Sequence, residues 1–545
     1  PERKLQEAVC VLLVELCERF TFLGIVCNMM VFCTVQLGYR SHQAAVLTVC
    51  FVGSSALSPV LAAWLAESLL GRVRLVCICM LLHFLGTALL PVVSFPFEDV
   101  YMDRRHLLHT LPKREQKIIF FFALLTASLG IGGIRAIVCP LSAYSLEHCG
   151  PKELLSFFNW FHWLVNLNSA VVFVSISYIQ QSVARNLGFL IPFVSGLMAM
   201  ITIHMLRGEM IYKPKTDSSL LRTFGVMVSA LRGCCVRQHY FSSTLPSWLD
   251  HAKENHGGQH SELQVESTKA LARLFPLFTF QVLYRACVMQ IPSGYYLQTM
   301  NSNLHFSGFV LPVAAMNVIS IVPLLILVPV LDCMNSWLFS SKDNAHSPTI
   351  YIVLGHFCAA LSVMLAGFSE IHRKHFPQVQ QTLAEEVLLV SSMPCFHLAP
   401  QYILLGVAEA LVTPSCSLLS FWLVPERMRG ISMHFLALFN GAGCFLGAFF
   451  VQTAHAGTQG KSYWFPHLLH EGKLERFFFF LASLMLVNML GFWSIAHRYN
   501  NLHEDCTNGF QGSLPGEKLL KHEKAIKHYN SILESSPILS PMEKS

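Results

Sequence analysis

Twelve apolar stretches limit the fold of this chain more than any other feature, because each has about the 20 residues that cross a bilayer as one α-helix. The sequence therefore predicts an all-α, polytopic membrane protein with twelve transmembrane helices. The stretches lie near residues 8–33, 45–70, 75–96, 118–142, 156–179, 187–206, 271–298, 307–331, 350–369, 398–424, 431–453 and 475–497.

The composition supports this class and argues against others. Of the 545 residues, 53% are hydrophobic and only 13% are charged, whereas a soluble globular domain has about 25% charged residues. The net charge of +6 comes without a basic tract that carries interleaved aromatic residues, so we expect a lipid bilayer and not nucleic acid as partner. Most of the 18 cysteines stand in apolar runs and none forms a CxxC pair, so we expect neither a disulfide framework nor a metal site.

A long polar segment divides the apolar stretches into two sets of six. We predict an N-terminal six-helix bundle over residues 1–206, a cytoplasmic connector over 207–269, a C-terminal six-helix bundle over 270–497 and a cytoplasmic tail over 498–545. This layout is that of the major facilitator fold, in which two halves surround a central cavity. His256 and His260 stand at helical spacing, but they lie in a polar, glycine-containing part of the connector, so we expect no metal there.

The tail and the orientation are less constrained by the sequence. Residues 517–533 have Leu and Ile at seven-residue spacing among lysines, which is compatible with an amphipathic helix on the inner membrane surface and equally with a disordered, solvated tail. Basic residues also occur in the segment 97–117 on the opposite side. The positive-inside rule therefore does not decide by itself which ends are cytoplasmic.

Three charged residues interrupt the first apolar stretch. Glu15, Glu18 and Arg19 stand at i, i+3 and i+4, so they project from one face of a helix. Charges inside a membrane are costly and usually face the bundle interior or a water-filled cavity. Two carboxylates against one guanidinium leave one negative charge that a single proton would neutralise. This favours a proton-coupled transporter, and the alternative is a fixed ion-pair network that holds helices together.

Several segments resemble the proton-coupled oligopeptide transporter family, also called solute carrier family 15, in order and at family spacing over nearly the whole chain. The match is most similar to the peptide/histidine branch. The resemblance rests on the first-helix residues Glu15–Gly24, on Pro59–Arg72, on Gly132–Pro140 in the fourth helix, on Phe157–Ser169 in the fifth, and on Gln401–Glu409 with Pro425–Arg429 around the tenth.

The resemblance implies residue roles. Glu15, Glu18 and Arg19 would serve in proton coupling, and Arg19 would also bind the carboxyl end of a peptide. Arg135 stands where many members have a lysine that pairs with those carboxylates, but an arginine keeps its proton and so cannot act as the same switch. Both chain ends would be cytoplasmic.

Further substrate-binding positions follow from the same resemblance. Asn166 matches an asparagine that contacts the peptide backbone, and Glu409 matches a glutamate that receives the amino group of the peptide. Gln290 lies in the seventh-helix segment of the family and is a further candidate. Cations on one half and an acid on the other also suit the dipole of a zwitterionic substrate.

The chain departs from the family at several cavity positions. Phe22 and Leu23 replace two tyrosines that many members have, and Val26 replaces an arginine. A histidine on the second helix of the mammalian peptide carriers falls at Val49, and an acidic residue on the seventh helix becomes Met289. These changes weaken the transfer of substrate preference from the family.

Arg285 is a guanidinium well inside the seventh helix. Facing the cavity, it would shift the preference toward anionic substrates; alternatively it would snorkel or pair with a first-helix glutamate. Because Pro292 and Gly294 weaken the helix nearby, we predict that Arg285 lines the cavity, within reach of Glu15 or Glu18.

Together these observations predict proton-coupled symport of di- and tripeptides or histidine-like amino acids by alternating access. The alternatives are a proton-linked carrier of another organic anion or zwitterion, and a degenerate carrier that acts as a sensor or scaffold. An enzyme is not expected, because no nucleophile–base or metal constellation is visible. We expect no cofactor besides the coupling proton, a monomer, and a place in the plasma membrane or an endolysosomal membrane.

Overall fold

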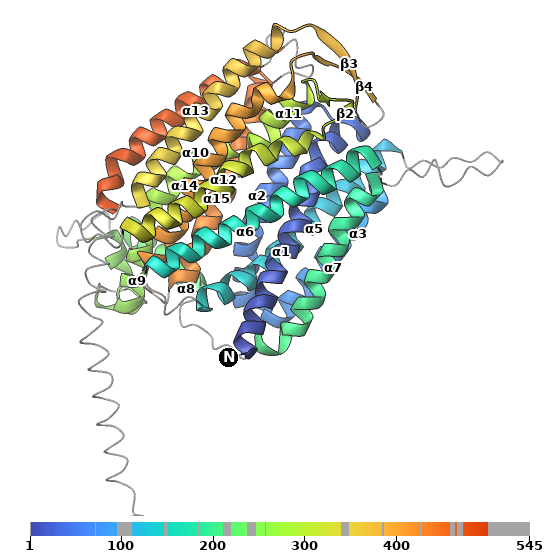
Figure 1. Cartoon of the computed structure of the whole chain (residues 1–545). Helices are drawn as coiled ribbons and strands as arrows, with labels where there is room; N and C mark the ends of the chain where they lie inside the picture. Colours follow the sequence, from blue (N-terminus) through green and yellow to red (C-terminus); the bar gives the residue numbers. More distant parts are fainter. Residues whose placement is uncertain are drawn as a thin grey trace, which may run out of the picture. The chain divides into compact units, whose positions relative to one another are not determined.

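The computed structural model describes thirteen stretches of the chain (Figure 1). Residues 1–494 form one compact unit, and residues 495–545 form a second, of which the structure describes only the first five residues. The predicted tail helix at 517–533 lies outside the described residues. The described residues are 2–70, 72–94, 112–145, 151–183, 185–210, 220–236, 247–256, 258–338, 348–383, 386–425, 428–457, 464–465 and 472–499.

The prediction of twelve membrane-spanning helices is confirmed, because 12 helices in the described residues are long and apolar enough to cross a membrane. Each overlaps one of the predicted stretches. The long helices are α1 (Glu2–Val31), α2 (Ser41–Leu65), α3 (Arg72–Ser94), α5 (Lys113–Ser145), α6 (Pro151–Tyr178), α7 (Arg185–Met210), α10 (Phe275–Val288), α12 (Asn317–Leu338), α13 (Pro348–Lys374), α14 (Ala399–Trp422), α15 (Arg429–Ala456) and a last span, Leu474–Tyr499.

The seventh span is interrupted where the sequence predicts weakness. Helix α10 ends at Val288, a π-helical turn follows over Ile291–Tyr295, and α11 (Tyr296–Met300) completes the span. Proline lacks the backbone N–H that an α-helix needs at its interior positions, and Pro292 stands at the start of the π turn. Such turns are frequent at functional sites.

Short hairpins add a minor β component that the prediction of an all-α fold does not contain. Strands β1 (His305–Phe306) and β2 (Phe309–Val310) pair through a turn in which Gly308 has a φ of 84°. Strands β3 (Gln378–Leu383) and β4 (Glu386–Ser391) pair antiparallel, with Gln378 opposite Ser391. Both hairpins connect spans, so the prediction of a helical membrane protein holds.

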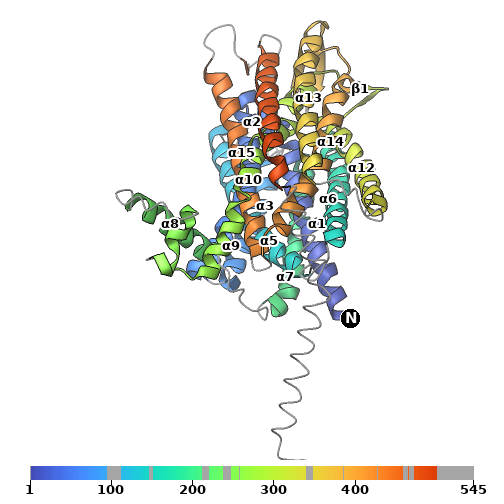
Figure 2. The same ribbon diagram turned by 90° about the vertical axis from the view of Figure 1, so that its left-hand side faces the viewer.

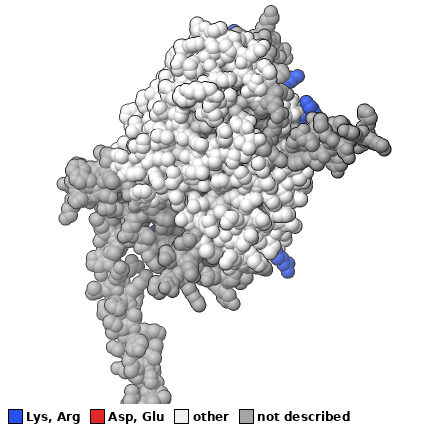
Figure 3. Space-filling model, turned by 45° about the vertical axis from the view of Figure 1, so that its right-hand side comes forward, with Lys and Arg blue, Asp and Glu red and all other residues white. Residues whose placement is uncertain are grey.

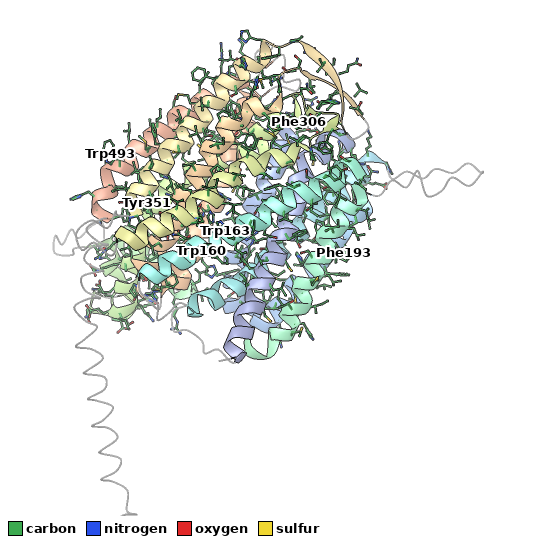
Figure 4. All side chains as sticks on the ribbon, in the orientation of Figure 1. Trp160, Trp163, Phe193, Phe306, Tyr351 and Trp493 are labelled. Atoms are coloured by element: carbon green, nitrogen blue, oxygen red, sulfur yellow. The ribbon has the colours of Figure 1, made fainter. Side chains whose placement is uncertain are left out.

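Helices from the first and the second predicted half pack together along their lengths. Helix α2 packs against α15, and α6 packs against α12 and α14. The indole Nε1 of Trp163 donates to the carbonyl oxygen of Leu325 at 2.9 Å, which ties α6 to α12 (Figure 4). Between α2 and α15 the rings of His42 and His455 stack with their centroids 3.5 Å apart. The division into two halves therefore stays a prediction, because residues 1–494 cluster as one unit.

The outer surface of the helices is apolar. Large hydrophobic side chains such as Leu81, Val171, Ile326 and Trp493 are exposed. In the view of Figure 3 the described middle of the molecule is almost wholly without charged side chains, and the visible Lys and Arg side chains lie toward its two ends. This is the surface that a helical bundle presents to lipid.

The predicted connector is partly folded. Helix α8 (Leu220–Val236), two 3₁₀ turns (Trp248–Ala252 and Glu254–His256) and α9 (Glu262–Ala272) pack around a small apolar cluster, and they lie together in Figure 2. The rings of Phe224 and Phe435 stack at 5.4 Å between α8 and α15. Beside the cluster the buried carboxylate of Asp250 forms ion pairs with Lys269 at 2.6 Å and Lys253 at 2.9 Å.

Close helix approach at Gly406 gives a first prediction. A Cβ atom there would lie 1.8 Å from the carbonyl oxygen of Ser320. Helix α14 can therefore approach α12 this closely only because residue 406 has no side chain. Small residues allow such contacts between membrane helices. Gly406→Ala should lower the free energy of unfolding by about 1–3 kcal/mol through overpacking, measured by thermal unfolding in detergent. Gly430→Ala, which would meet no described atom within 4 Å, is the matched control, and equal loss in both would contradict this packing.

The Asp250 ion pairs give a second prediction. Burial works to raise the pKa of Asp250, but hydrogen bonds from Lys269 and Lys253 outweigh it and leave the pKa below its ordinary value. A lowered folded-state pKa means that Asp250 stabilises the connector above the ordinary carboxyl pKa of about 3.9, and that this is lost as the pH falls through the folded-state value. At pH 7, Asp250→Asn should therefore speed amide hydrogen exchange in α9. Unchanged exchange would show that these ion pairs contribute nothing.

Candidate functional site

The first cluster of charges lies on α1. Arg19 Nε donates to Glu15 Oε1 at 2.9 Å and lies 3.8 Å from Glu18 Oε2. The three side chains therefore meet on one helix face, as their spacing predicts. Glu18 is completely buried, whereas the side chain of Arg19 is 32% exposed. A buried carboxylate requires a nearby cation or a proton, so Glu18 is the member of the cluster whose charge depends most on its partners.

Arg135 on α5 supplies a second cation to this cluster. Its Nε donates to Glu18 Oε1 at 3.1 Å, and its Nη2 lies 3.0 Å from the same oxygen. The count of two carboxylates against one guanidinium is therefore wrong for the folded protein. Two guanidinium groups face two carboxylates, and the cluster is neutral without an added proton.

Small residues on α5 explain how Arg135 reaches α1. A Cβ atom on Gly132 would lie 2.0 Å from the hydroxyl oxygen of Ser58, so α2 and α5 are in close contact one turn before Arg135. The ring of Phe22 then lies under the guanidinium, 4.7 Å from its centre. A cation over an aromatic face is stabilised electrostatically. Phe22, which lacks the hydroxyl of the family tyrosine, thus still positions Arg135.

A second cluster lies between α10 and α14. Glu409 Oε1 accepts from the Tyr284 hydroxyl at 3.2 Å and from Arg285 Nη1 at 3.5 Å, and its Oε2 accepts from Thr413 Oγ1 at 3.0 Å. The contact of Arg285 with Glu15 or Glu18 that the sequence suggested is not among the described contacts. Glu409 is the carboxylate that the fold brings to it, and its side chain points into the bundle toward α14.

His162 on α6 lies between the two clusters. It is close enough to Glu409, Arg19 and Arg285 to interact electrostatically with all three. Asn166, one turn further along α6, donates its side-chain N–H to the carbonyl oxygen of His162 at 2.8 Å. The amide of Asn166 is therefore engaged within its own helix in this conformation.

The remaining predicted positions are buried. Gln290 is 1% exposed and donates to the carbonyl oxygen of Ala286, one turn earlier in α10. Val26, Val49 and Met289, which replace charged or titratable residues of the family, are all buried among apolar side chains. Among the predicted site residues that the structure describes, the charged side chains therefore lie in the two clusters.

Sequence reasoning did not select Tyr284 and Thr413, which hold the Glu409 carboxylate. Thr413 stands four residues after Glu409, a spacing that places both on one face of α14. The sequence spacing is therefore sufficient to predict this contact. Tyr284 is adjacent to Arg285 but lies on α10, 125 residues from Glu409 in sequence. Only the fold, in which α10 and α14 each pack against α13 and α15, reveals that pair.

Three carboxylates and three guanidinium groups make up the two clusters, and no group of three or more potential metal ligands occurs in the described part of the chain. A charged ligand at such a site would compete with these ion pairs for their partners. Each carboxylate that loses its guanidinium becomes a place where a proton can be taken up.

Comparison with known proteins adds independent findings. The chain matches the model of the POT family over residues 73–465. It is 55% identical to the human protein Solute carrier family 15 member 5 over 534 residues, which is 98% of this chain and 92% of that protein.

Solved structures confirm the predicted fold class. The POT family transporter PepTSo gives a TM-score of 0.67 at 17% identity and covers 91% of this chain and 98% of its own. A POT family transporter in complex with 5-aminolevulinic acid gives 0.61 at 15% identity, covering 91% and 96%.

The Glu18–Arg135 pair gives a third prediction. Arg135→Ala should lower the free energy of unfolding by about 3–5 kcal/mol, because it leaves a buried carboxylate whose next guanidinium is more distant. The double variant Arg135→Ala/Glu18→Gln should recover most of this loss. Thermal unfolding in detergent measures both, with Lys374→Ala, which breaks the partly exposed pair with Glu475, as a control of small effect. A double variant no more stable than the single one would contradict the pairing.

Proposed function

The chain belongs to the POT family of transporters, and on that premise we propose that it carries out proton-coupled symport of small peptides or amino-acid-like solutes by alternating access. It is a multi-pass membrane protein of a transporter family and not of an enzyme family. We further propose that the protein acts as a monomer. An acidic side of the membrane that could drive uptake is available at the plasma membrane or at an endolysosomal compartment.

The observation that supports this proposal best is the environment of Glu18. This carboxylate is fully buried and lies between Arg135 on α5 and Arg19 on its own helix. The partly exposed Arg19 is the member of the cluster that an incoming carboxylate can reach. When a substrate carboxylate draws a guanidinium away, the buried Glu18 would be left with too little positive charge, at a cost of several kcal/mol.

A proton on Glu18 removes that cost. Binding of a substrate carboxylate and uptake of one proton then balance in charge, and the occupied site remains neutral. Neither step alone is favourable inside the bundle, because each would leave an uncompensated charge in a medium of low dielectric constant. This mutual dependence is what couples the movement of substrate to that of the proton.

The test is accumulation in proteoliposomes under an inward proton gradient. Each coupled proton contributes a factor of about ten in accumulation per pH unit, so Glu18→Gln should lower the steady-state level by about that factor while counterflow exchange continues. Glu475→Gln, a carboxylate paired with Lys374 outside both clusters, is the matched control.

Two outcomes would count against the proposal. Wild-type accumulation in the Glu18→Gln variant would remove Glu18 from the coupling path. Absence of uptake of dipeptides, histidine and N-acetylated histidine at every pH would instead favour a member of the family that has become a sensor or scaffold.

A further inference from the structure

Two arginine–glutamate pairs in the second half of the chain differ in a way that separates a structural pair from a binding site. Arg373 contacts Glu370 through two nitrogens, at 2.7 Å and 3.0 Å, and both side chains are almost fully buried. Arg285 reaches Glu409 through one nitrogen at 3.5 Å, and its side chain is 29% exposed. A single contact at this distance is weak beside a bidentate pair. Arg285 is therefore held near Glu409 but not saturated by it.

The surroundings of Arg285 hold its side chain in place and leave one of its N–H donors without an acceptor in the described part of the chain. Its Cβ and Cγ atoms pack on Gly443 of α15, where a Cβ atom would come within 2.6 Å of the arginine stem. The thiol of Cys444 also interacts with the guanidinium. The Nε donor of Arg285 has no hydrogen-bond acceptor among the described residues. A guanidinium with spare donors in a fixed place suits a carboxylate, which it binds bidentately.

Glu409 would keep two hydrogen bonds if the guanidinium of Arg285 moved away. Hydroxyl groups already donate to both of its oxygens, Tyr284 to Oε1 and Thr413 to Oε2. A hydroxyl can also accept a hydrogen bond, so either contact can be kept when Glu409 carries a proton and becomes a donor. The carboxyl group can therefore change its charge without leaving its place.

From these contacts we propose that Arg285 binds the carboxylate of the substrate and that Glu409 takes up a proton in exchange. The proposal rests on the proton-coupled transport inferred above and adds a second site where a carboxylate can exchange with a proton. Each bound carboxylate occupies one of the two sites and therefore carries one proton. The bound state contains the substrate carboxylate on Arg285 and a neutral Glu409, so one proton enters with one negative charge and the site keeps its net charge. Two carboxylates that share one cation cannot both remain ionised cheaply, which provides the driving force.

Other titratable groups near the pair also respond to its charge. On the described elements that pack around it, those that interact with Glu409, Arg285 or Tyr284 are His162 of α6, Cys416 of α14, Cys444 of α15 and His356 of α13. Of these, His162 also interacts with Arg19. A pH dependence assigned to Glu409 must therefore be separated from one due to His162, and His162→Gln serves that purpose.

The proposal specifies the substrate class. A substrate amine can reach Glu409 only by displacing a guanidinium that is tethered beside it, so the amine adds little to affinity. The preferred ligands are small carboxylates whose amino group is absent or blocked, such as N-acylated amino acids and peptides. This reverses the expectation that Glu409 receives the amino group of a peptide.

The binding test uses the purified full chain and two matched probes, L-histidine and N-acetyl-L-histidine. Ligand-induced thermal stabilisation in detergent reports affinity without requiring transport. The wild type should bind N-acetylhistidine at least as tightly as histidine. Arg285→Gln should weaken N-acetylhistidine by about tenfold or more, as expected when one partner of a charge pair is lost, and should weaken histidine less, because Glu409 then becomes free for the amine. Arg285→Lys should keep part of the affinity, and Arg222→Gln on the exposed face of α8 is the control.

The coupling test uses the same probes in proteoliposomes. Glu409→Gln should retain binding of N-acetylhistidine but lower its accumulation by about tenfold per pH unit of gradient, the contribution of one proton. His162→Gln should leave the Glu409 effect intact.

The outcomes separate this proposal from the transport function itself. Acid-driven uptake of histidine with strong discrimination against N-acetylhistidine, unchanged in Arg285→Gln, would overturn the proposal and leave the transport function standing. Uptake of N-acetylhistidine with full coupling in Glu409→Gln would overturn the proton step. If neither probe bound and neither was taken up, the proposal would be overturned together with the transport function.

Discussion

The ion pair between Glu18 and Arg135 is the interaction on which the rest of the structure depends. It joins α1 to α5, and it neutralises a carboxylate that has no exposed surface. A membrane bundle can contain such a group only if a cation or a proton accompanies it. The close approach of α2 and α5 at Gly132, the ring of Phe22 under Arg135 and the position of Arg19 all maintain that neutral state.

The same requirement for charge neutrality applies to the second cluster. Arg285 and Glu409 neutralise each other between α10 and α14, and His162 lies close enough to both clusters to interact with their charges. With three carboxylates balanced by three guanidinium groups, the site has no spare charge for a substrate. Any charged solute must therefore exchange with an existing ion pair, and protons complete the balance. In the proposed mechanism, coupling is then a consequence of charge neutrality inside the bundle, and no single residue has to act as a dedicated proton carrier.

Sequence patterns predicted those features that depend on neighbouring residues or on long apolar runs. The twelve spans follow from length and hydropathy, and the contact between Glu15 and Arg19 follows from their spacing of four. The pairing of Arg135 with a first-helix carboxylate came from the family resemblance. Partners that are far apart in the sequence are not predictable from local pattern. The side chains of α10 and α14 meet because both helices pack against α13 and α15. For that reason Arg285 was assigned to Glu15 or Glu18, although the fold brings Glu409 to it. The hairpin of β3 and β4 lies in a connection between two spans, and the continuous apolar run in β4 gives no alternating pattern that would indicate a strand.

In the proposed mechanism, substrate carboxylates and protons enter the same neutral site together. Proteoliposomes that contain the wild-type protein and a trapped pH-sensitive dye test this most directly, with no pH gradient at the start. Addition of N-acetyl-L-histidine outside should acidify the interior at a rate proportional to its uptake. Uptake of the labelled compound without any change in internal pH would contradict the account.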